Sequence, residues 1–148
     1  MKPILTIDPG GSGGFALVCN DGTVEAYPMP EGMTAQIDAI RSMAVANPGL
    51  VAIMEKVGFH RPGNSAVSTA KFARRCGHLE AALYSAKIPF EEVAPCTWMK
   101  ALGALPADKT ARKNAIKETV ARRFPHLKVT LKTADALGML VWARTKTV

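Results

Sequence analysis

Three acidic residues interrupt apolar segments of the sequence, where a neutral side chain would be easier to bury. Asp8 follows the run 2–7, Glu55 follows the run 50–54, and Asp135 lies near the start of the apolar segment 133–142. A carboxylate at the end of a buried strand is costly to desolvate unless it is paired or binds a cation. If the three carboxylates converge, with no His or Cys among them, they favour a hard, oxygen-preferring ion such as Mg²⁺ or Mn²⁺.

Each of these acids also has a purely structural interpretation. Asp8 could start a turn through its side chain. Glu55 could pair with Lys56, which follows it, and Asp135 could stabilise the N-terminus of a helix electrostatically. A shared site explains the three together better, because all of them interrupt apolar segments.

Short apolar runs and turn signals predict the elements that position these acids. We expect strands at residues 2–7, 15–19, 23–27, 50–54 and 90–93. The Gly-rich segment 9–14 and the turn Asn20-Asp21-Gly22 join the first three strands into an antiparallel meander. We expect helices at 34–47 with Thr34 as the cap, at 65–86, at 98–102 as a short turn, at 108–124 with Asp108 as the cap, and from about 133.

This order of elements predicts an α/β fold. We expect a mixed five-stranded sheet, with three antiparallel strands followed by parallel strands, and with helices on both faces. The order is that of the ribonuclease H-like fold. Residues 1–148 contain no internal repeat and no long linker, so we expect one domain. If the first and fourth strands are neighbours, Asp8 and Glu55 meet at one end of the sheet.

The segments that contain the three acids resemble a known family. Residues 4–10 (ILTIDPG), 52–57 (AIMEKV) and 134–137 (ADAL) are similar, in this order, to the acidic motifs of RuvC-like Holliday junction resolvases. Residues 98–103 (WMKALG) and 108–109 (DK) look like segments of the divergent or phage-encoded branches of that family. The resemblance covers nearly the whole chain, and the ordered set of three motifs is more specific than the first motif alone.

The resemblance implies a divalent-metal-dependent endonuclease that cleaves Holliday junctions or other branched DNA by phosphodiester hydrolysis. It also implies a homodimer, since two symmetric nicks need two active sites. Asp8, Glu55 and Asp135 would hold the ions, Mg²⁺ or Mn²⁺, and Lys109 would lie near the scissile phosphate.

Two positions depart from the pattern of the family. Lys132 stands three residues before Asp135, where bacterial resolvases usually carry a fourth acid or a histidine. Its ammonium could act on the acidic site and the phosphate, or it could point to solvent. Phe59, which would stack at the centre of a junction, is displaced by about one residue from the aromatic position of the family.

Positive charge is concentrated in the last third of the chain. Residues 1–97 carry 8 Lys and Arg against 9 Asp and Glu, whereas residues 98–148 carry 11 against 3, so the net charge of +7 arises after residue 97. Clustered Lys and Arg favour a polyanionic partner, because binding releases counterions. The residues expected to contact DNA are Phe59, Arg61, Lys71, Arg74, Arg75, Lys100, Arg112 and Lys113. A solvated basic surface is the alternative interpretation.

Length and composition argue against several other classes of protein. No apolar run approaches the roughly 20 residues of a membrane span, and the N-terminus reaches Asp8 too early for a signal peptide. We therefore expect a protein of the cytoplasm, in a bacterial or phage-infected cell, with no membrane partner. Three widely spaced cysteines argue against a disulfide framework or a zinc knuckle. Two alternatives stay open: a YqgF-like RNA-processing nuclease, and a non-catalytic nucleic-acid-binding module of the same fold.

Overall fold

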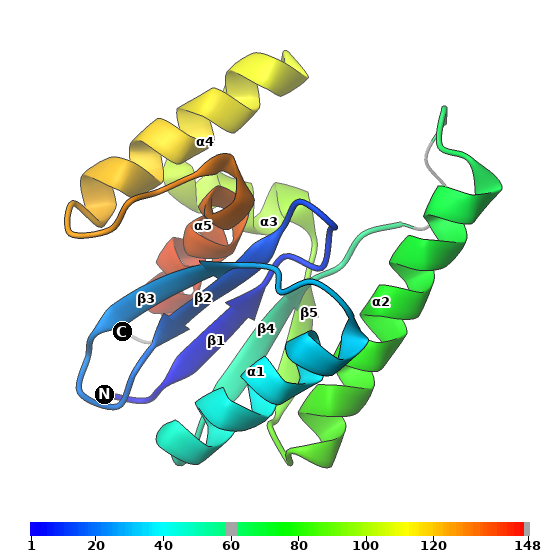
Figure 1. Cartoon of the computed structure of the whole chain (residues 1–148). Helices are drawn as coiled ribbons and strands as arrows, with labels where there is room; N and C mark the ends of the chain where they lie inside the picture. Colours follow the sequence, from blue (N-terminus) through cyan, green and yellow to red (C-terminus); the bar gives the residue numbers. More distant parts are fainter. Residues whose placement is uncertain (59–61, 147–148) are drawn as a thin grey trace.

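The computed structural model describes residues 1–58 and 62–146 and is built on a five-stranded mixed sheet (Figure 1). The strands are β1 (Ile4–Ile7), β2 (Gly14–Val18), β3 (Val24–Pro28), β4 (Val51–Glu55) and β5 (Phe90–Val93). They lie in the order β3-β2-β1-β4-β5. The pairs β1–β2 and β2–β3 are antiparallel, whereas β1–β4 and β4–β5 are parallel. The predicted ribonuclease H-like sheet is confirmed, and the first and fourth strands are neighbours.

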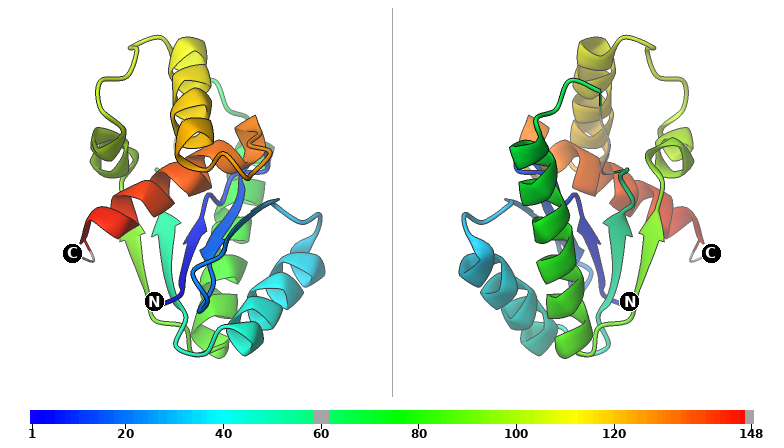
Figure 2. Two further views of the ribbon diagram at one scale, coloured as in Figure 1. Left: turned by 90° about the vertical axis from the view of Figure 1, so that its left-hand side faces the viewer. Right: turned by 90° about the vertical axis from the view of Figure 1, so that its right-hand side faces the viewer.

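Helices cover both faces of this sheet (Figures 1 and 2). On one face lie α1 (Met33–Ala46) and α2 (Ala66–Ser85), and on the other lies α5 (Leu131–Lys146). The short elements α3 (Pro95–Met99) and η1 (Lys100–Leu102) contact α5, and α4 (Lys109–Arg123) packs against α5 as well. No helix in the described ranges is long and apolar enough to cross a lipid bilayer.

The alternation of side chains along β1 divides the core into two layers. Leu5 and Ile7 are fully buried in the layer under α1 and α2, and Ile4 belongs to the layer under α5. Thr6 is fully buried, and its hydroxyl donates a hydrogen bond of 2.6 Å to the carbonyl oxygen of Ala136 in α5. A buried hydroxyl needs such a partner, so this bond fixes the N-terminal half of α5 against β1.

The structure corrects the predicted start of two helices. Thr34 does not cap α1, because Gly32 occupies the cap position, with a φ of 86° and no capping side chain. A positive φ is strained for most residues and open to glycine, so the backbone selects Gly32 here. The last helix begins at Leu131, two residues before its expected start. As a result, Lys132 lies in the first turn of α5.

Candidate active site

The parallel pairing of β1 and β4 brings two of the three acids together. Ile7 is opposite Met54 in the register. The residues that come next, Asp8 directly after β1 and Glu55 at the end of β4, therefore lie at the same edge of the sheet. Glu55 is buried, with 8% of its surface exposed, and Asp8 is half-buried. The expected meeting of these two positions at one end of the sheet is confirmed.

The Gly-rich turn after β1 wraps closely around Asp8. The Gly10 N–H donates a hydrogen bond of 3.1 Å to Asp8 Oδ1. A Cβ atom at Gly13 would lie 2.6 Å from Asp8 Cγ, so no larger residue fits there without moving the carboxylate. Arg75 of α2 reaches the same turn: its Nη1 donates to the carbonyl oxygen of Pro9 at 3.4 Å. The same turn therefore contacts an acid, Asp8, and a cation, Arg75.

The third acid, Asp135, enters this region from α5. The pKa of the Asp135 carboxyl is raised from 3.8 to about 6. Burial is the larger cause, and the negative charge of Asp8 is the second. Lys113 and Arg112 act in the opposite direction. Because the charge of Asp8 contributes to the shift, the two aspartates lie within electrostatic reach of each other, on different elements.

The buried carboxylate of Glu55 has a partner that the sequence analysis missed. The indole Nε1 of Trp98, in α3, donates a hydrogen bond of 2.7 Å to Glu55 Oε2. Trp98 is fully buried, and from the sequence it is most simply a core residue. A buried indole N–H needs an acceptor, and a buried glutamate at a strand end is a natural one, but this requirement alone does not identify the pair in the sequence.

All three acids line one cleft, of about 720 Å³, together with basic side chains. Asp108 caps α4 as predicted, accepting a hydrogen bond of 2.9 Å from the Ala111 N–H, and thereby places Lys109 at the first helical position. The basic residues that line the cleft are Arg75, Lys109, Arg112, Lys113 and Lys132. The cleft thus combines carboxylates, which can bind a cation, with positive charges, which can bind a phosphate.

Three of the remaining expected DNA contacts lie outside the cleft. Lys71 and Arg74 on α2 and Lys100 in η1 are exposed, and none of the three lines the cleft. Phe59 and Arg61 lie outside the described residues. Of the eight positions expected to contact DNA, the cleft brings together Arg75, Arg112 and Lys113.

Comparison with solved structures identifies the fold. The structure of T. thermophilus RuvC in complex with Holliday junction substrate is similar, with a TM-score of 0.65 and 19% identity over 99% of this chain and 98% of that chain. A second Thermus thermophilus RuvC structure gives 0.59 and 19% over 98% and 97%. The fold is that of the RuvC-like resolvases. Fowlpox virus resolvase in a complex with substrate Holliday junction DNA has a TM-score of 0.53 and 10% identity over 98% and 99%.

No family model and no curated protein sequence matches the chain. The likeness therefore rests on the backbone, which is shared almost from end to end at low sequence identity. The predicted resemblance to RuvC-like resolvases is confirmed as a resemblance of fold.

The acids of this RuvC-like fold have the chemistry of a divalent-cation site. All three offer only carboxylate oxygens, which Mg²⁺ and Mn²⁺ prefer. The raised pKa of Asp135 beside Asp8 also fits, because a bound cation would remove the repulsion between the two charges. Within residues 1–58 and 62–146, no three His, Cys, Asp or Glu side chains lie close enough together to hold an ion. Binding one through all three acids would require the carboxylates to draw closer.

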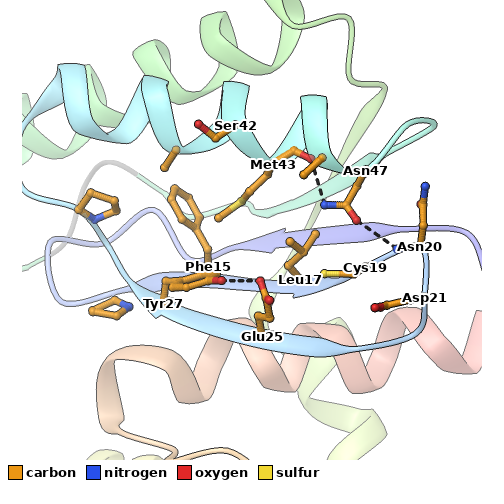
Figure 3. A pocket seen from close by; sticks show the side chains of 14 residues that line it. Phe15, Leu17, Cys19, Asn20, Asp21, Glu25, Tyr27, Ser42, Met43 and Asn47 are labelled. Carbon is orange, nitrogen blue, oxygen red and sulfur yellow. Dashed lines mark hydrogen bonds between the residues drawn. The ribbon is translucent and has the colours of Figure 1, made fainter.

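A second cavity, of about 750 Å³, lies between α1 and the strands β2 and β3 (Figure 3). Its wall is largely apolar, with Phe15 of β2 and Met43 of α1 facing each other. The Tyr27 hydroxyl donates a hydrogen bond to Glu25 at one side, and this bond, with burial, raises the pKa of Tyr27 to about 12. None of the described residues that line this cavity is basic. It therefore lacks the positive charge to bind a phosphate backbone, and the cleft that contains Asp8, Glu55 and Asp135 is the candidate active site.

Proposed function

We propose that this chain is a divalent-metal-dependent endonuclease that cleaves Holliday junctions or other branched DNA by phosphodiester hydrolysis. The observation that carries the proposal is the composition of the cleft. Among the described residues, its lining combines five cations with three acids, one directly after β1, one at the end of β4 and one in α5. Acids alone would suit any metal site, and cations alone would suit any polyanion. Their combination suits a metal-assisted reaction at a phosphate. The similarity of the fold to structures solved with Holliday junction DNA favours DNA as the substrate.

The three acids have the role of binding Mg²⁺ or Mn²⁺. When bound, the ions would activate a water molecule and stabilise the departing 3′ oxygen. Asp8 is held by the Gly-rich turn and Glu55 by the Trp98 indole, so both carboxylates are oriented by neighbouring groups. Asp135 is placed by the buried N-terminal half of α5.

The cations of the cleft have the role of binding the scissile phosphate. Lys109 begins α4, so its ammonium and the positive end of the helix dipole act on the same region. Lys132, in the first turn of α5, stands where bacterial resolvases usually carry a fourth acid or a histidine, and it adds positive charge to the lining of the cleft. We propose that both lysines act on the negative charge that develops at the phosphate during cleavage.

The exposed basic residues outside the cleft have the role of binding DNA further from the cut. Lys71 and Arg74 on α2 and Lys100 in η1 would follow the phosphates of the arms that flank the reacting strand. A four-way junction has two equivalent strands to cut. We therefore propose a homodimer that brings two clefts to one junction.

The test is cleavage of a labelled four-way junction, in parallel with linear duplex DNA and single-stranded RNA, each with Mg²⁺, Mn²⁺ or EDTA. We expect nicks in the junction with either ion, little cleavage of the duplex, and no cleavage in EDTA. Cleavage of RNA in preference to the junction would instead support an RNA-processing nuclease. Junction binding without cleavage under any metal would support a non-catalytic module.

Site variants connect that activity to the cleft. We expect Asp8→Asn, Glu55→Gln and Asp135→Asn each to abolish cleavage while leaving junction binding largely intact, because metal chemistry and phosphate binding use different side chains. Asp38→Asn is the matched control, since Asp38 is an exposed acid on α1. Near wild-type cleavage by two of the three site variants would contradict the assignment.

A further inference from the structure

We propose that Trp98 is a positioning residue for the metal ligand Glu55, and that Gly138 of α5 leaves the space in which the Trp98 ring packs. The inference rests on the proposed function only in treating Glu55 as a ligand. In this arrangement the indole N–H fixes the orientation of the carboxylate at the wall of the cleft. The role of Trp98 is thus distinct from that of a residue that only fills the core.

The hydrogen bond is made where both partners are withdrawn from water. Trp98 is 0% exposed and Glu55 8%, and the donor–acceptor distance is 2.7 Å. A hydrogen bond to an ionised group is about twice as strong as one between neutral groups, and a low local dielectric strengthens it. An acid that rotates freely would lose entropy on binding an ion, whereas one already held in place loses less.

The sheet register brings the two residues together. Glu55 at the end of β4 pairs with Val93 at the end of β5, and the Lys56 N–H donates to the carbonyl oxygen of Val93 at 2.8 Å. The chain then turns directly into α3, which begins at Pro95. Proline at the first helical turn has a fixed φ and needs no N–H partner, so it favours a helix start at this position. Trp98 therefore emerges one helical turn from the edge at which Glu55 lies.

Gly138 gives the indole its position. A Cβ atom at Gly138 would lie 2.6 Å from Cζ3 of Trp98 and 3.1 Å from Cε3, so the ring packs against bare helix backbone. Glycine inside a helix is less stable than alanine by about 1 kcal/mol, and a glycine in a buried helix therefore needs a packing reason. Gly138 follows Asp135 by three residues, about one turn. One turn of α5 thus carries Asp135 and also Gly138, against which Trp98, the partner of Glu55, packs.

The sequence also contains a matched control. Trp142 belongs to the same core cluster as Trp98 and is 8% exposed, but its ring is contacted by the Lys146 ammonium, 4.0 Å from the ring centroid. Trp142→Phe removes an indole from the same core layer without touching Glu55. Trp98→Phe removes the N–H donor and keeps an aromatic ring.

The first experiment measures Mn²⁺ binding directly, from the electron paramagnetic resonance signal of the free ion. Loss of a group that orients a metal ligand typically lowers metal affinity by about 10–100-fold. We expect that loss for Trp98→Phe and for Gly138→Ala, and an unchanged affinity for Trp142→Phe. Circular dichroism verifies that each variant is folded, and junction binding in EDTA stays at the wild-type level. Equal Mn²⁺ affinities for folded Trp98→Phe and Trp142→Phe would overturn the proposal.

A second measurement keeps the wild-type side chain at position 98. The chain has two tryptophans, so Trp142→Phe leaves Trp98 as the sole indole emitter. We expect Mg²⁺ to change its emission in a saturable way, and Glu55→Gln to abolish that change. Emission that does not respond to Mg²⁺, in a protein that binds the ion, would overturn the proposal even if Trp98→Phe failed to fold.

These experiments distinguish failure of the positioning role from failure of the proposed nuclease function. If the wild-type protein binds Mn²⁺ but cuts no junction, and Trp98→Phe weakens that binding, the positioning role stands and the nuclease assignment fails. If junctions are cut and the Mn²⁺ affinity of folded Trp98→Phe is unchanged, the positioning role alone fails. A wild-type protein that binds no Mn²⁺ overturns both.

Discussion

Replacing Asp135 with Asn should stabilise the metal-free protein at neutral and alkaline pH. Burial and the charge of Asp8 raise the pKa of Asp135 from 3.8 to about 6, so the folded state binds this proton more readily than the unfolded state does. Such a difference corresponds to about 3 kcal/mol between the two protonation states. Asp135 is partly exposed, and solvent screens part of the effect, so we expect about 2 kcal/mol.

The sign of the effect sets its pH window. Below about pH 4, Asp135 is protonated in both states and contributes no penalty to folding. As the pH rises from about 4 to 6, the unfolded state ionises first and the folded state loses stability relative to it. Above that window the penalty is constant. The stability gained by Asp135→Asn should therefore be absent near pH 4 and complete by about pH 7.

Urea denaturation in EDTA, at pH 4 and at pH 8, measures this gain. For a chain of this length, about 2 kcal/mol also corresponds to a rise in Tm of about 4–8 °C. Asp38→Asn, an exposed change on α1, should leave stability unchanged at both pH values. Saturating Mg²⁺ should stabilise the wild type and not the variant, because only the wild type retains the full ligand set.

An equal effect of Asp135→Asn at both pH values would refute this reasoning, because a change independent of pH cannot come from an ionisation. A loss of stability at pH 8 would refute it more directly. That result would mean that the carboxylate makes favourable interactions in the metal-free cleft that outweigh the cost of its burial and the repulsion by Asp8.

Three further predictions concern the cations and the turn of the cleft. Lys132→Asp should lower the Mg²⁺ concentration for half-maximal cleavage, and Lys132→Ala should slow cleavage without weakening junction affinity; superimposable metal titrations for these and the wild type would exclude a role in the site. Neutralising Lys71 and Lys100 together should flatten the plot of log affinity against log salt by about 1.8, at about 0.9 per lost phosphate contact; an unchanged slope would assign both to solvated surface. Gly13→Ala should abolish cleavage because its methyl group would lie 2.3 Å from the backbone oxygen of Asp8 and 2.6 Å from its carboxylate carbon, whereas Gly77→Ala, with nothing within 4 Å, should not.

The placement of Asp8 and Glu55 could be predicted from the sequence because local signals were sufficient. Each acid ends an apolar run, and the turn at residues 20–22 fixes the antiparallel start of the sheet. A helix then returns the chain to form a parallel neighbour, and parallel strands place their carboxyl ends at one edge. The meeting of these two acids therefore depends on pairing rules rather than on details of packing.

Other features could not be predicted from such signals. The bond between Trp98 and Glu55 joins residues 43 positions apart, and nothing near Trp98 in the sequence distinguishes it from an ordinary core residue. Gly32 rather than Thr34 is the N-cap of α1. The backbone enters the helix there with a positive φ, which depends on the path of the preceding loop. Both outcomes are set by the three-dimensional arrangement, which periodicity and capping preferences do not describe.

The burial of α5 connects the stability of the protein to the chemistry of the cleft. Thr6 bonds the backbone of α5 at Ala136, and the residues on either side of Asp135, from Ala136 to Ala143 and at Thr133 and Ala134, are buried. The backbone at Asp135 therefore cannot move away from Asp8 without disturbing the core. The same burial that fixes the carboxylate also raises its pKa. A metal-free cleft therefore holds two acids in mutual repulsion. A bound cation would recover that free energy, and this makes a divalent ion both the expected cofactor and the expected stabiliser of the fold.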